Sequence, residues 1–454
     1  DAAVARLAEF YLWQIEGSGP TLAVEFMSKE LGWALRHARS SLSPATVAHV
    51  AEVVASAEPV RVYVDTLAHR PPEGLYNFNT FSLAGEQLLR TAGLRDDDHY
   101  IEAHLPHHRR RFTDLGLYCD PDAAVVYDWV PRCNLTTLIE AGFAGAGAQQ
   151  ISDLLRQGAL TQLLLHNPQG LGWFGGRSNQ YLFNEMQLCV ICEYEATRWQ
   201  PEDKAVAGMF RRAARLGLRA VRSWLHLDPP RHIKNAFPPA VGWGFDTYGT
   251  YAVYLMLAAS LMTFAYHYAS DDIEEAPLPS EITAYAMDLG PAFHQAVAHS
   301  PCANLQWDLK ANRGYDATGL GRVLWAGAPL QLSLLAPAPG NPSYLLASWL
   351  RPAGEKPRRG FQVLRAAAAS CAWQVGEDGD WQRLAEKQPE SYNFTQEETD
   401  EGLRVTIVWS VDGGEVRSLF LLRDDDLAVT WEVPGAWRVR AEWPLLVTDG
   451  LANP

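Results

Sequence analysis

The segment LRVTIVWSV, Leu403–Val411, decides how the C-terminal part of the chain folds. Its apolar residues fall at every second position: Leu403, Val405, Ile407 and Trp409. A period of two is typical of a β-strand with one buried face, whereas a helix places apolar residues about three or four positions apart. The turn sequence VDGGEV overlaps its end, and the apolar segments VRSLFLL and LAVTWEV follow. We therefore predict an antiparallel sheet, arranged as a β-sandwich.

Upstream of this segment, apolar residues recur at the spacing of α-helices. About eleven such stretches, rich in Ala and Leu and separated by Pro, Gly or Asp, lie between Ala2 and His299, and the last covers Glu281–His299. Antiparallel helices joined by short loops, without strands between them, are typical of helical hairpins that close into a ring. We therefore predict an α+β multidomain protein, with an N-terminal (α/α)6 toroid over residues 1–300 and a C-terminal antiparallel β-sandwich over residues 301–454.

The composition excludes several classes of partner. The 454 residues are 48% hydrophobic and 20% charged, and the formal net charge is -15. The chain can therefore bury a large core, but it has no basic surface that would attract phosphate backbones or anionic lipids. The longest apolar segment, Tyr251–Tyr268, is interrupted by tyrosines, Ser260 and His267, which predicts a buried helix rather than a membrane span. We expect neither nucleic acid nor a membrane as a partner.

Cysteine and histidine patterns predict no metal and no cofactor. Six cysteines are too few for a disulfide scaffold, and the one pair with ligand spacing, Cys189 and Cys192, lies in an apolar helical run. The segment HLPHHRRRF contains His104, His107 and His108 followed by three arginines. This pattern favours a solvated basic helix face over a metal site.

The start of the chain bears on its location. The segment DAAVARLAEFYLWQI is amphipathic, begins with an acidic residue, and lacks the basic start and cleavage site of a signal peptide. We therefore expect a cytoplasmic protein, while a periplasmic or secreted chain would look the same after trimming. The sequence is compatible with a homo-oligomer.

The densest polar cluster, GWFGGRSNQYLFNEMQ at Gly172–Gln187, marks a candidate site at the start of a predicted helix, Asn179–Arg198. On a helical projection Arg177, Tyr181 and Glu185 share one stripe. An exposed first turn with Arg177 paired to Glu185 would explain part of the pattern. However, Asn, Gln and Tyr are poor residues for a helix surface compared with Lys, Glu and Ala. We therefore predict that this turn binds a ligand.

Two further polar clusters lie at predicted helix starts. GLYCDPDAAVVYDWVPRCNL contains Tyr127, with Asp128 and Arg132 at i and i+4, and HIKNAFPPAVGWGFDTYGTYAVYLML contains Lys234 and Asp246, the latter as an N-cap. Each has a structural interpretation, an ion pair in the first and a cap with an aromatic core stripe in the second. Together the three clusters have what a sugar cleft requires, because aromatic rings stack on pyranose rings, amides bind hydroxyls, and Arg or Lys binds a carboxylate. The residues that we expect to bind substrate are Arg177, Asn179, Gln180, Asn184, Tyr127, Arg132, Lys234, Asn235, Trp243 and Tyr251.

The motifs GGRSNQYLFNEMQ, KNAFPP, GFDTYGTYAVYLML and YDATGLGRV occur in this order, and over roughly Tyr118–Pro339 the chain resembles glycoside hydrolase family 154. The resemblance implies a toroid-plus-sandwich enzyme of heparinase II/III-like architecture that acts on glucuronate-containing glycans. Tyr181 and Ala236 depart from the family's pattern, in which a histidine and a basic residue are usual. These departures keep open a non-catalytic glycan-binding protein on the same fold.

Glycosidic hydrolysis is the first of two reactions that fit a uronate in such a cleft. It needs a carboxylic acid that protonates the leaving oxygen and a second carboxylate that acts as nucleophile or base. We predict Glu185 as the acid and Asp128 or Asp246 as its partner.

β-Elimination is the alternative reaction. It needs side chains such as Arg177 and Asn184 to neutralise the uronate carboxylate, and Tyr181 or Tyr248 to remove the C5 proton. We favour hydrolysis because Glu185 lies within the motif that carries the resemblance.

Overall fold

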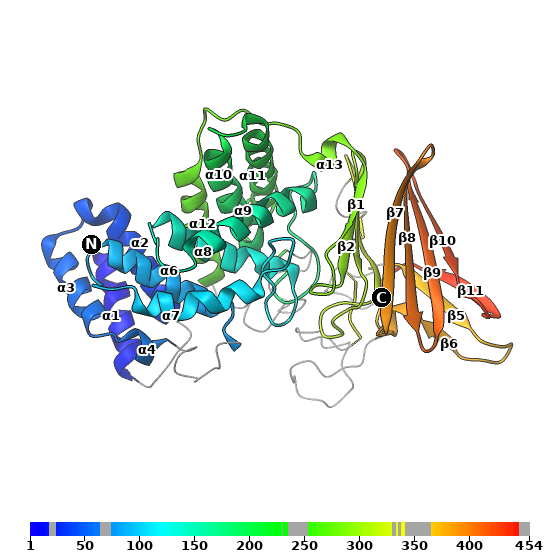
Figure 1. Cartoon of the computed structure of the whole chain (residues 1–454), viewed down its shortest axis with the longest axis horizontal. Helices are drawn as coiled ribbons and strands as arrows, with labels where there is room; N and C mark the ends of the chain where they lie inside the picture. Colours follow the sequence, from blue (N-terminus) through cyan, green and yellow to red (C-terminus); the bar gives the residue numbers. More distant parts are fainter. Residues whose placement is uncertain are drawn as a thin grey trace. The chain divides into compact units, whose positions relative to one another are not determined.

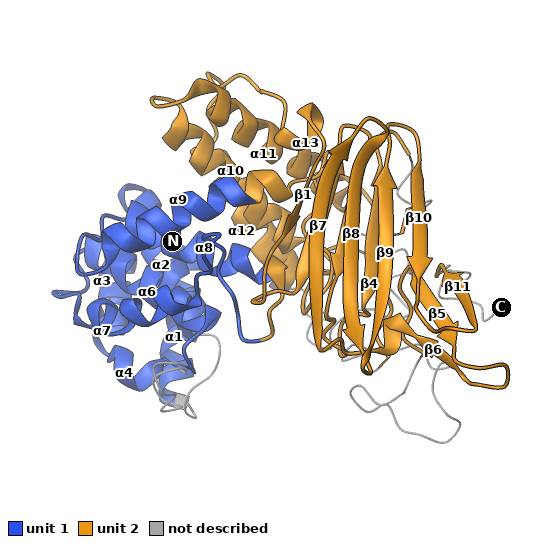
Figure 2. Cartoon of the chain, turned by 45° about the vertical axis from the view of Figure 1, so that its right-hand side comes forward, with its two compact units in different colours: residues 1–121, 127–161 blue, residues 122–126, 162–454 orange. Residues whose placement is uncertain are grey.

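The computed structural model of the 454-residue chain describes residues 1–17, 24–63, 74–228, 230–234, 253–328, 333–334, 337–340 and 365–444. Helices lie in the N-terminal part of the chain and antiparallel sheets in the C-terminal part (Figure 1). The predicted α+β class is thus confirmed. The chain forms two units, residues 1–121 with 127–161 and residues 122–126 with 162–454 (Figure 2).

The first unit is built from helices. They are α1 (Ala2–Gly17), α2 (Val24–Ala38), α3 (Pro44–Ala55), α4 (Pro59–Val62), α6 (Asn77–Thr91), α7 (His99–His108), α8 (Trp129–Glu140) and most of α9 (Ala148–Leu165). Helix α3 starts at a strong signal, because the Ser43 hydroxyl accepts the Thr46 N–H and Pro44 needs no hydrogen-bond acceptor at the first position. Apolar side chains from these helices share one core, which includes Tyr11, Leu31, Val50, Leu83 and Leu135.

Two helices of the first unit, α6 and α8, are buried on all sides. Every residue is buried from Asn79 to Leu89 in α6 and from Trp129 to Leu138 in α8. Helix α6 packs against both α2 and α8. Its contact with α2 requires glycine, because a Cβ atom at Gly32 would lie 2.5 Å from Leu88 Cβ.

The second unit contributes the remaining helices, α10 (Phe183–Trp199), α11 (Lys204–Leu225), α12 (Val253–Tyr268) and α13 (Pro279–Ile282). Helix α10 packs against both α11 and α12. Helix α11 begins after Asp203, whose carboxylate accepts the N–H groups of Ala205 and Val206.

Helix α12 differs from the buried helix that we predicted at Tyr251–Tyr268. It buries Ala258 and Leu261, but 69% of Met256 and 85% of Tyr266 are exposed. The sequence overestimated its burial because nearly all of its residues are apolar, so no polar stripe marked the solvent face. Across the described residues, no helix has the length and apolar character that crossing a bilayer requires.

The strands of the second unit pair antiparallel throughout the described part of the chain. One sheet has the order β1-β2-β3-β4, a second β10-β9-β8-β7 and a third β11-β5-β6. The strands are β1 (Tyr285–Asp288), β2 (Gln295–Ser300), β3 (Ala303–Asp308), β4 (Gly319–Trp325), β5 (Ser370–Gln374), β6 (Trp381–Arg383), β7 (Ser391–Thr399), β8 (Gly402–Val411), β9 (Gly414–Leu422), β10 (Leu427–Glu432) and β11 (Arg438–Glu442).

Strand β8 confirms the prediction for Leu403–Val411. Its alternate residues Leu403, Val405, Ile407 and Trp409 are buried, and those between them are more exposed. The hairpin to β9 turns at Asp412 and Gly413, whose φ angles are 51° and 75°. Two consecutive positive φ angles match the right-handed twist of the flanking strands.

The predicted helix at Glu281–His299 is wrong, because β1, β2 and the turn between them occupy residues 285–299. Ala286, Leu289, Phe293 and Ala296 mimic helical spacing, but they lie on both sides of a hairpin. Gly290, with φ of 78° and followed by proline, makes the turn. The first sheet therefore begins upstream of residue 301.

The histidine-rich segment at the end of α7 is also less exposed than predicted. His108 is fully buried, and its ring nitrogens bond the Tyr118 hydroxyl at 2.9 Å and Asn79 Oδ1 at 2.8 Å. Burial lowers the pKa of His108 to about 3. The three arginines that follow His108 in the sequence suggested an exposed helix end, whereas His108 itself faces inward and is neutral.

Candidate functional site

Glu185, in the first turn of α10, is the centre of the candidate site in the second unit. Its side chain is fully buried. Oε1 accepts hydrogen bonds from Lys234 Nζ at 2.5 Å and from the Gly172 N–H at 2.9 Å. Oε2 is buried and has no hydrogen-bond partner among the described residues.

Lys234 reaches Glu185 through a short backbone pairing. The Leu182 N–H donates to His232 O at 2.8 Å and the Lys234 N–H to Gln180 O at 2.7 Å, so the two segments run side by side just before α10. Burial lowers the pKa of Lys234, although the carboxylate of Glu185 acts in the opposite direction. The ion pair thus joins two of the three polar clusters.

A second cation, Arg322 on β4, holds the loop that precedes α10. Its Nη1 donates to Gly172 O at 2.6 Å, and its guanidinium lies 5.9 Å from the centre of the Phe174 ring. Burial lowers the pKa of Arg322 to about 10, while Glu185 acts to raise it. The group therefore stays protonated at neutral pH.

Asp316 holds the same loop at its other end. Its Oδ2 accepts the Gly176 N–H at 2.9 Å. Gly175 and Gly176 have φ angles of 75° and 73°, and a Cβ atom at Gly175 would lie 2.7 Å from Asp316 Oδ1, so glycine is required there. Burial raises the pKa of Asp316 to about 7, and burial together with Asp316 raises the pKa of Asp308.

Stability should fall with rising pH because of this carboxyl group. The pKa of Asp316 is higher in the folded chain than its ordinary value of 3.8, so the folded state binds this proton more tightly than the unfolded state. The resulting stabilisation of the fold is complete below about pH 4 and is lost as pH rises through about 7. We expect the decline to be on the order of 2–4 kcal/mol, and Asp316→Asn to reduce it. Urea unfolding from pH 4 to 8 measures this, with the exposed Asp412→Asn as control. Identical pH dependence in the wild type and Asp316→Asn would contradict the prediction.

The first sheet presents a buried polar face to this loop. Its polar residues alternate with apolar ones and are Gln295 and His299 on β2, Asn304, Gln306 and Asp308 on β3, and Arg322 on β4. The Trp173 indole N–H donates to Gln295 Oε1. Phe174 packs directly on Gly321, where a Cβ atom would lie 2.3 Å from the phenyl ring. The loop therefore covers the polar face.

Arg322, Asp316 and Asp308 are the site residues that sequence reasoning missed. The first two lie in YDATGLGRV, which carried the resemblance but received no role. Asp308 ends ANLQWD, whose alternation of polar and apolar residues was the available signal. The same alternation is usual for a face in contact with water, so it does not by itself indicate a buried site.

The predicted stripe of Arg177, Tyr181 and Glu185 is wrong, because α10 begins only at Phe183. Arg177 Nε instead bonds Asp122 Oδ2 at 2.6 Å, with both side chains about one-fifth exposed. Tyr181 is fully buried and its ring stacks on Tyr254 at 5.1 Å. Ser178, with φ of 65°, breaks the helical path before these residues could align.

The amides of the same cluster have separate surroundings. Asn184 is buried, and its Nδ2 donates to Ser178 O at 2.7 Å and to Tyr181 O at 3.0 Å, which closes the turn before the helix. Asn179 and Gln180 are half-buried. The backbone carbonyl of Gln180 accepts the Lys234 N–H.

Asp128, Arg132 and Tyr127 belong to the first unit, whereas Glu185 belongs to the second. Asp128 and Arg132 form a fully buried ion pair, with Arg132 Nε 2.8 Å from Asp128 Oδ2. Asp128 also accepts the Tyr118 N–H at 2.6 Å, and Arg132 donates to Leu155 O at 2.6 Å and Gly116 O at 2.7 Å. These contacts give the pair a structural role.

The remaining predicted residues, Asn235, Trp243, Asp246, Tyr248 and Tyr251, lie outside the described residues.

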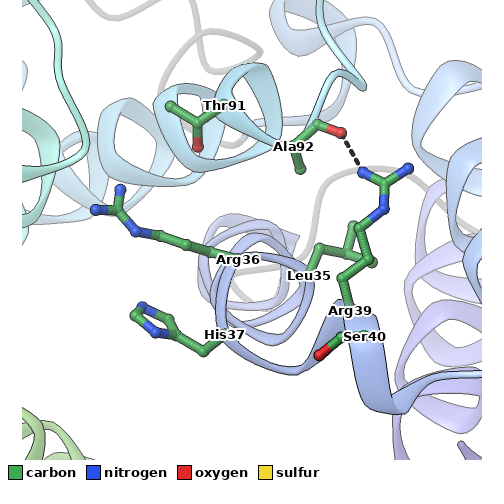
Figure 3. Close-up of a pocket in the computed structure, with 7 residues that line it drawn as sticks. All are labelled: Leu35, Arg36, His37, Arg39, Ser40, Thr91 and Ala92. Atoms are coloured by element: carbon green, nitrogen blue, oxygen red, sulfur yellow. Dashed lines mark hydrogen bonds between the residues drawn. The ribbon is translucent and has the colours of Figure 1, made fainter.

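Two features of the first unit resemble ligand sites. A hollow of about 500 Å³ is lined by Leu35, Arg36, His37, Arg39, Ser40, Thr91 and Ala92 (Figure 3). Arg39 donates to Ala92 O at 2.7 Å and Arg36 pairs with Glu140 at 2.7 Å, so protein groups already engage both guanidinium groups. Within the described ranges, Asp98, His99 and Glu102 bring three metal-ligand atoms within 4.8 Å of one another, at a largely exposed position.

No protein-family model, curated protein or solved structure matches the chain. The assignment of a function therefore rests on the chemistry of the residues around Glu185.

Proposed function

We propose that this protein is a glycoside hydrolase that cleaves uronic-acid-containing oligosaccharides of the glucuronate type, with Glu185 as its general acid. The observation that carries the proposal is the carboxylate of Glu185. Lys234 and Gly172 hold one of its oxygens, and the other is buried without a hydrogen-bond partner in the described part of the chain. An unsatisfied buried polar atom is unfavourable for stability, and such atoms are often retained for catalysis.

The second carboxylate that hydrolysis requires is assigned to Asp246 or Asp128. Asp246 lies in the same sequence cluster as Lys234, the residue that pairs with Glu185. Asp128 is already paired with Arg132, which makes it the weaker candidate.

We further propose the (α/α)6 toroid for the helical part. Helices buried on all sides alternate along the chain with helices buried on one face, as inner and outer rings require. Helices α6, α8 and α10 are of the first kind, and α7 and α11 are of the second. In support, α6 packs on α8 in one unit and α10 packs on α12 in the other, and each of these pairs skips one helix along the chain.

A β-sandwich is proposed for the sheets. Trp307 and Leu305 of the first sheet share one core with Ile407, Trp409 and Phe420 of the second. The rings of Trp307 and Phe420 lie 5.0 Å apart. Two strand layers face each other in this part of the second unit (Figure 1). A core shared between two inner faces is typical of sandwiches.

Arg177 is proposed to bind the substrate carboxylate, because a guanidinium offers paired hydrogen bonds that an ammonium does not. Arg177→Lys should raise KM for a glucuronide by about tenfold or more, the effect of losing one such bond, with little change in kcat or Tm. Steady-state kinetics and thermal unfolding measure this. Early unfolding with normal kinetics would instead assign Arg177 a structural role through Asp122.

A panel of glucuronate-capped oligosaccharides tests the proposed reaction. Release of free uronate without an ultraviolet-absorbing product is expected for a hydrolase. An unsaturated, absorbing product would identify a lyase that acts by β-elimination. Neither product, combined with measurable binding in calorimetry, would identify a non-catalytic glycan-binding protein.

A further inference from the structure

We infer that Arg322, on strand β4 of the first sheet, is a positioning residue for Glu185 and acts through the backbone of Gly172. The inference rests on the proposed catalytic role of Glu185. A residue of the first sheet would thus position a catalytic side chain of helix α10.

The geometry of Gly172 links the two side chains. Its N–H donates to Glu185 Oε1 at 2.9 Å, and its carbonyl accepts Arg322 Nη1 at 2.6 Å. A Cβ atom at Gly172 would lie 3.2 Å from Glu185 Oε1, which is a tight approach. Gly172 therefore donates its N–H to the Glu185 carboxylate and accepts a hydrogen bond from Arg322 at its carbonyl.

Arg322 is well placed to fix this backbone. Only 8% of the residue is exposed, Phe174 lies against its guanidinium, and Gln306 Oε1 lies 3.5 Å from Nη1. Its planar guanidinium donates in a set direction, whereas an ammonium on a flexible chain does not. The Gly172 carbonyl belongs to the Gly172–Trp173 peptide, whereas its N–H belongs to the Leu171–Gly172 peptide, whose carbonyl also accepts Asn167 Nδ2 at 2.7 Å. Loss of Arg322 lets the first peptide turn at the glycine Cα and shifts the N–H of the second, which leaves Lys234 as the main partner of Glu185 Oε1.

Small displacements of a catalytic group have large effects on rate. A misplacement of about 1 Å lowers a rate by about 10²-fold. Arg322→Gln should therefore lower kcat for a glucuronide by about 10- to 100-fold, while KM stays within about threefold because Arg322 does not contact substrate in this proposal. Arg322→Lys should recover part of the lost kcat, since it restores a single donor and the positive charge.

A matched control is Arg383→Gln. Arg383 is also an arginine with 8% exposure in the second unit, but it pairs with Glu442 at 3.1 Å on the third sheet. Its replacement should lower Tm to a similar extent and leave kcat unchanged. An equal loss of kcat in Arg383→Gln and Arg322→Gln would overturn the inference, because any buried arginine would then have the same effect.

A double-mutant cycle with Glu185→Gln separates this inference from the proposed function. If Arg322 acts through Glu185, Arg322→Gln should lower activity little further once Glu185 is changed. Additive losses would overturn the positioning role and leave the role of Glu185 intact. Full activity of Glu185→Gln alone would overturn the proposed function and, with it, this inference.

Crystal structures of the wild type and Arg322→Gln provide a measurement that does not depend on activity. The expected result is a Gly172 carbonyl released from β4 and a Gly172 N–H that no longer donates to Glu185. A Gly172–Glu185 contact unchanged from the wild type would overturn the inference even if the variant is less active.

Discussion

Replacing Glu185 with Gln should lower kcat/KM for a glucuronate-containing oligosaccharide by a factor on the order of 10²–10⁴. The amide keeps the shape of the carboxyl group and an oxygen that can accept the Lys234 and Gly172 donors. The N–H groups of the amide are not acidic enough to protonate the leaving oxygen. Steady-state assays of released uronate measure the effect, and thermal unfolding shows whether the variant remains folded.

A second substrate separates the roles open to Glu185. A nitrophenyl glucuronide has a leaving group that departs without protonation, so Glu185→Gln should retain much of the rate at which that bond is cleaved. Equal losses on both substrates would make Glu185 the nucleophile or a binding residue. Undiminished cleavage of the oligosaccharide would remove Glu185 from the mechanism.

The matched control for Glu185 is Glu193→Gln on the same helix. Glu193 is also buried, but it pairs with Arg211 and not with Lys234. We expect this variant to unfold more easily and to keep its activity. A loss of activity similar to that of Glu185→Gln would indicate that any buried carboxylate on α10 supports the fold of the site.

Arg132→Leu should lower the free energy of unfolding by about 3–5 kcal/mol, the usual effect of removing one partner from a buried ion pair. The change leaves the Asp128 carboxylate buried without its cation. It also removes the guanidinium N–H groups that donate to Leu155 O and Gly116 O. Urea unfolding measures the loss, and the double variant Asp128→Leu with Arg132→Leu should recover part of it because no lone charge remains.

An exposed ion pair provides the comparison. Glu397→Ala, which removes the partner of Arg404 at the surface of β7 and β8, should change stability by less than about 1 kcal/mol. A similarly small effect of Arg132→Leu would contradict the structural role of the buried pair. Asp128→Asn that folds normally but loses activity would restore Asp128 as the second catalytic carboxylate.

The predictions that held depend on patterns within one element. The alternation of Leu403, Val405, Ile407 and Trp409 places four side chains on one face of a strand, whatever that strand packs against. The polar start of α10 was visible for the same reason, since Asn184, Glu185 and Gln187 directly precede the apolar run 188–192. Local spacing failed at Glu281–His299, where a hairpin reproduced helical spacing across its turn.

The sequence by itself determined the α+β class, the face of β8 that is buried, and the choice of Glu185 as a candidate. Only the tertiary structure decided that Lys234 and not Arg177 pairs with Glu185, and that Arg322 and Asp316 hold the loop before α10. The physical reason is that residue spacing encodes which side of an element is apolar, but not which distant element covers it. The polar face of β3 looks like a solvent-facing surface in the sequence, and becomes part of the site only because the loop that contains Trp173 folds over it.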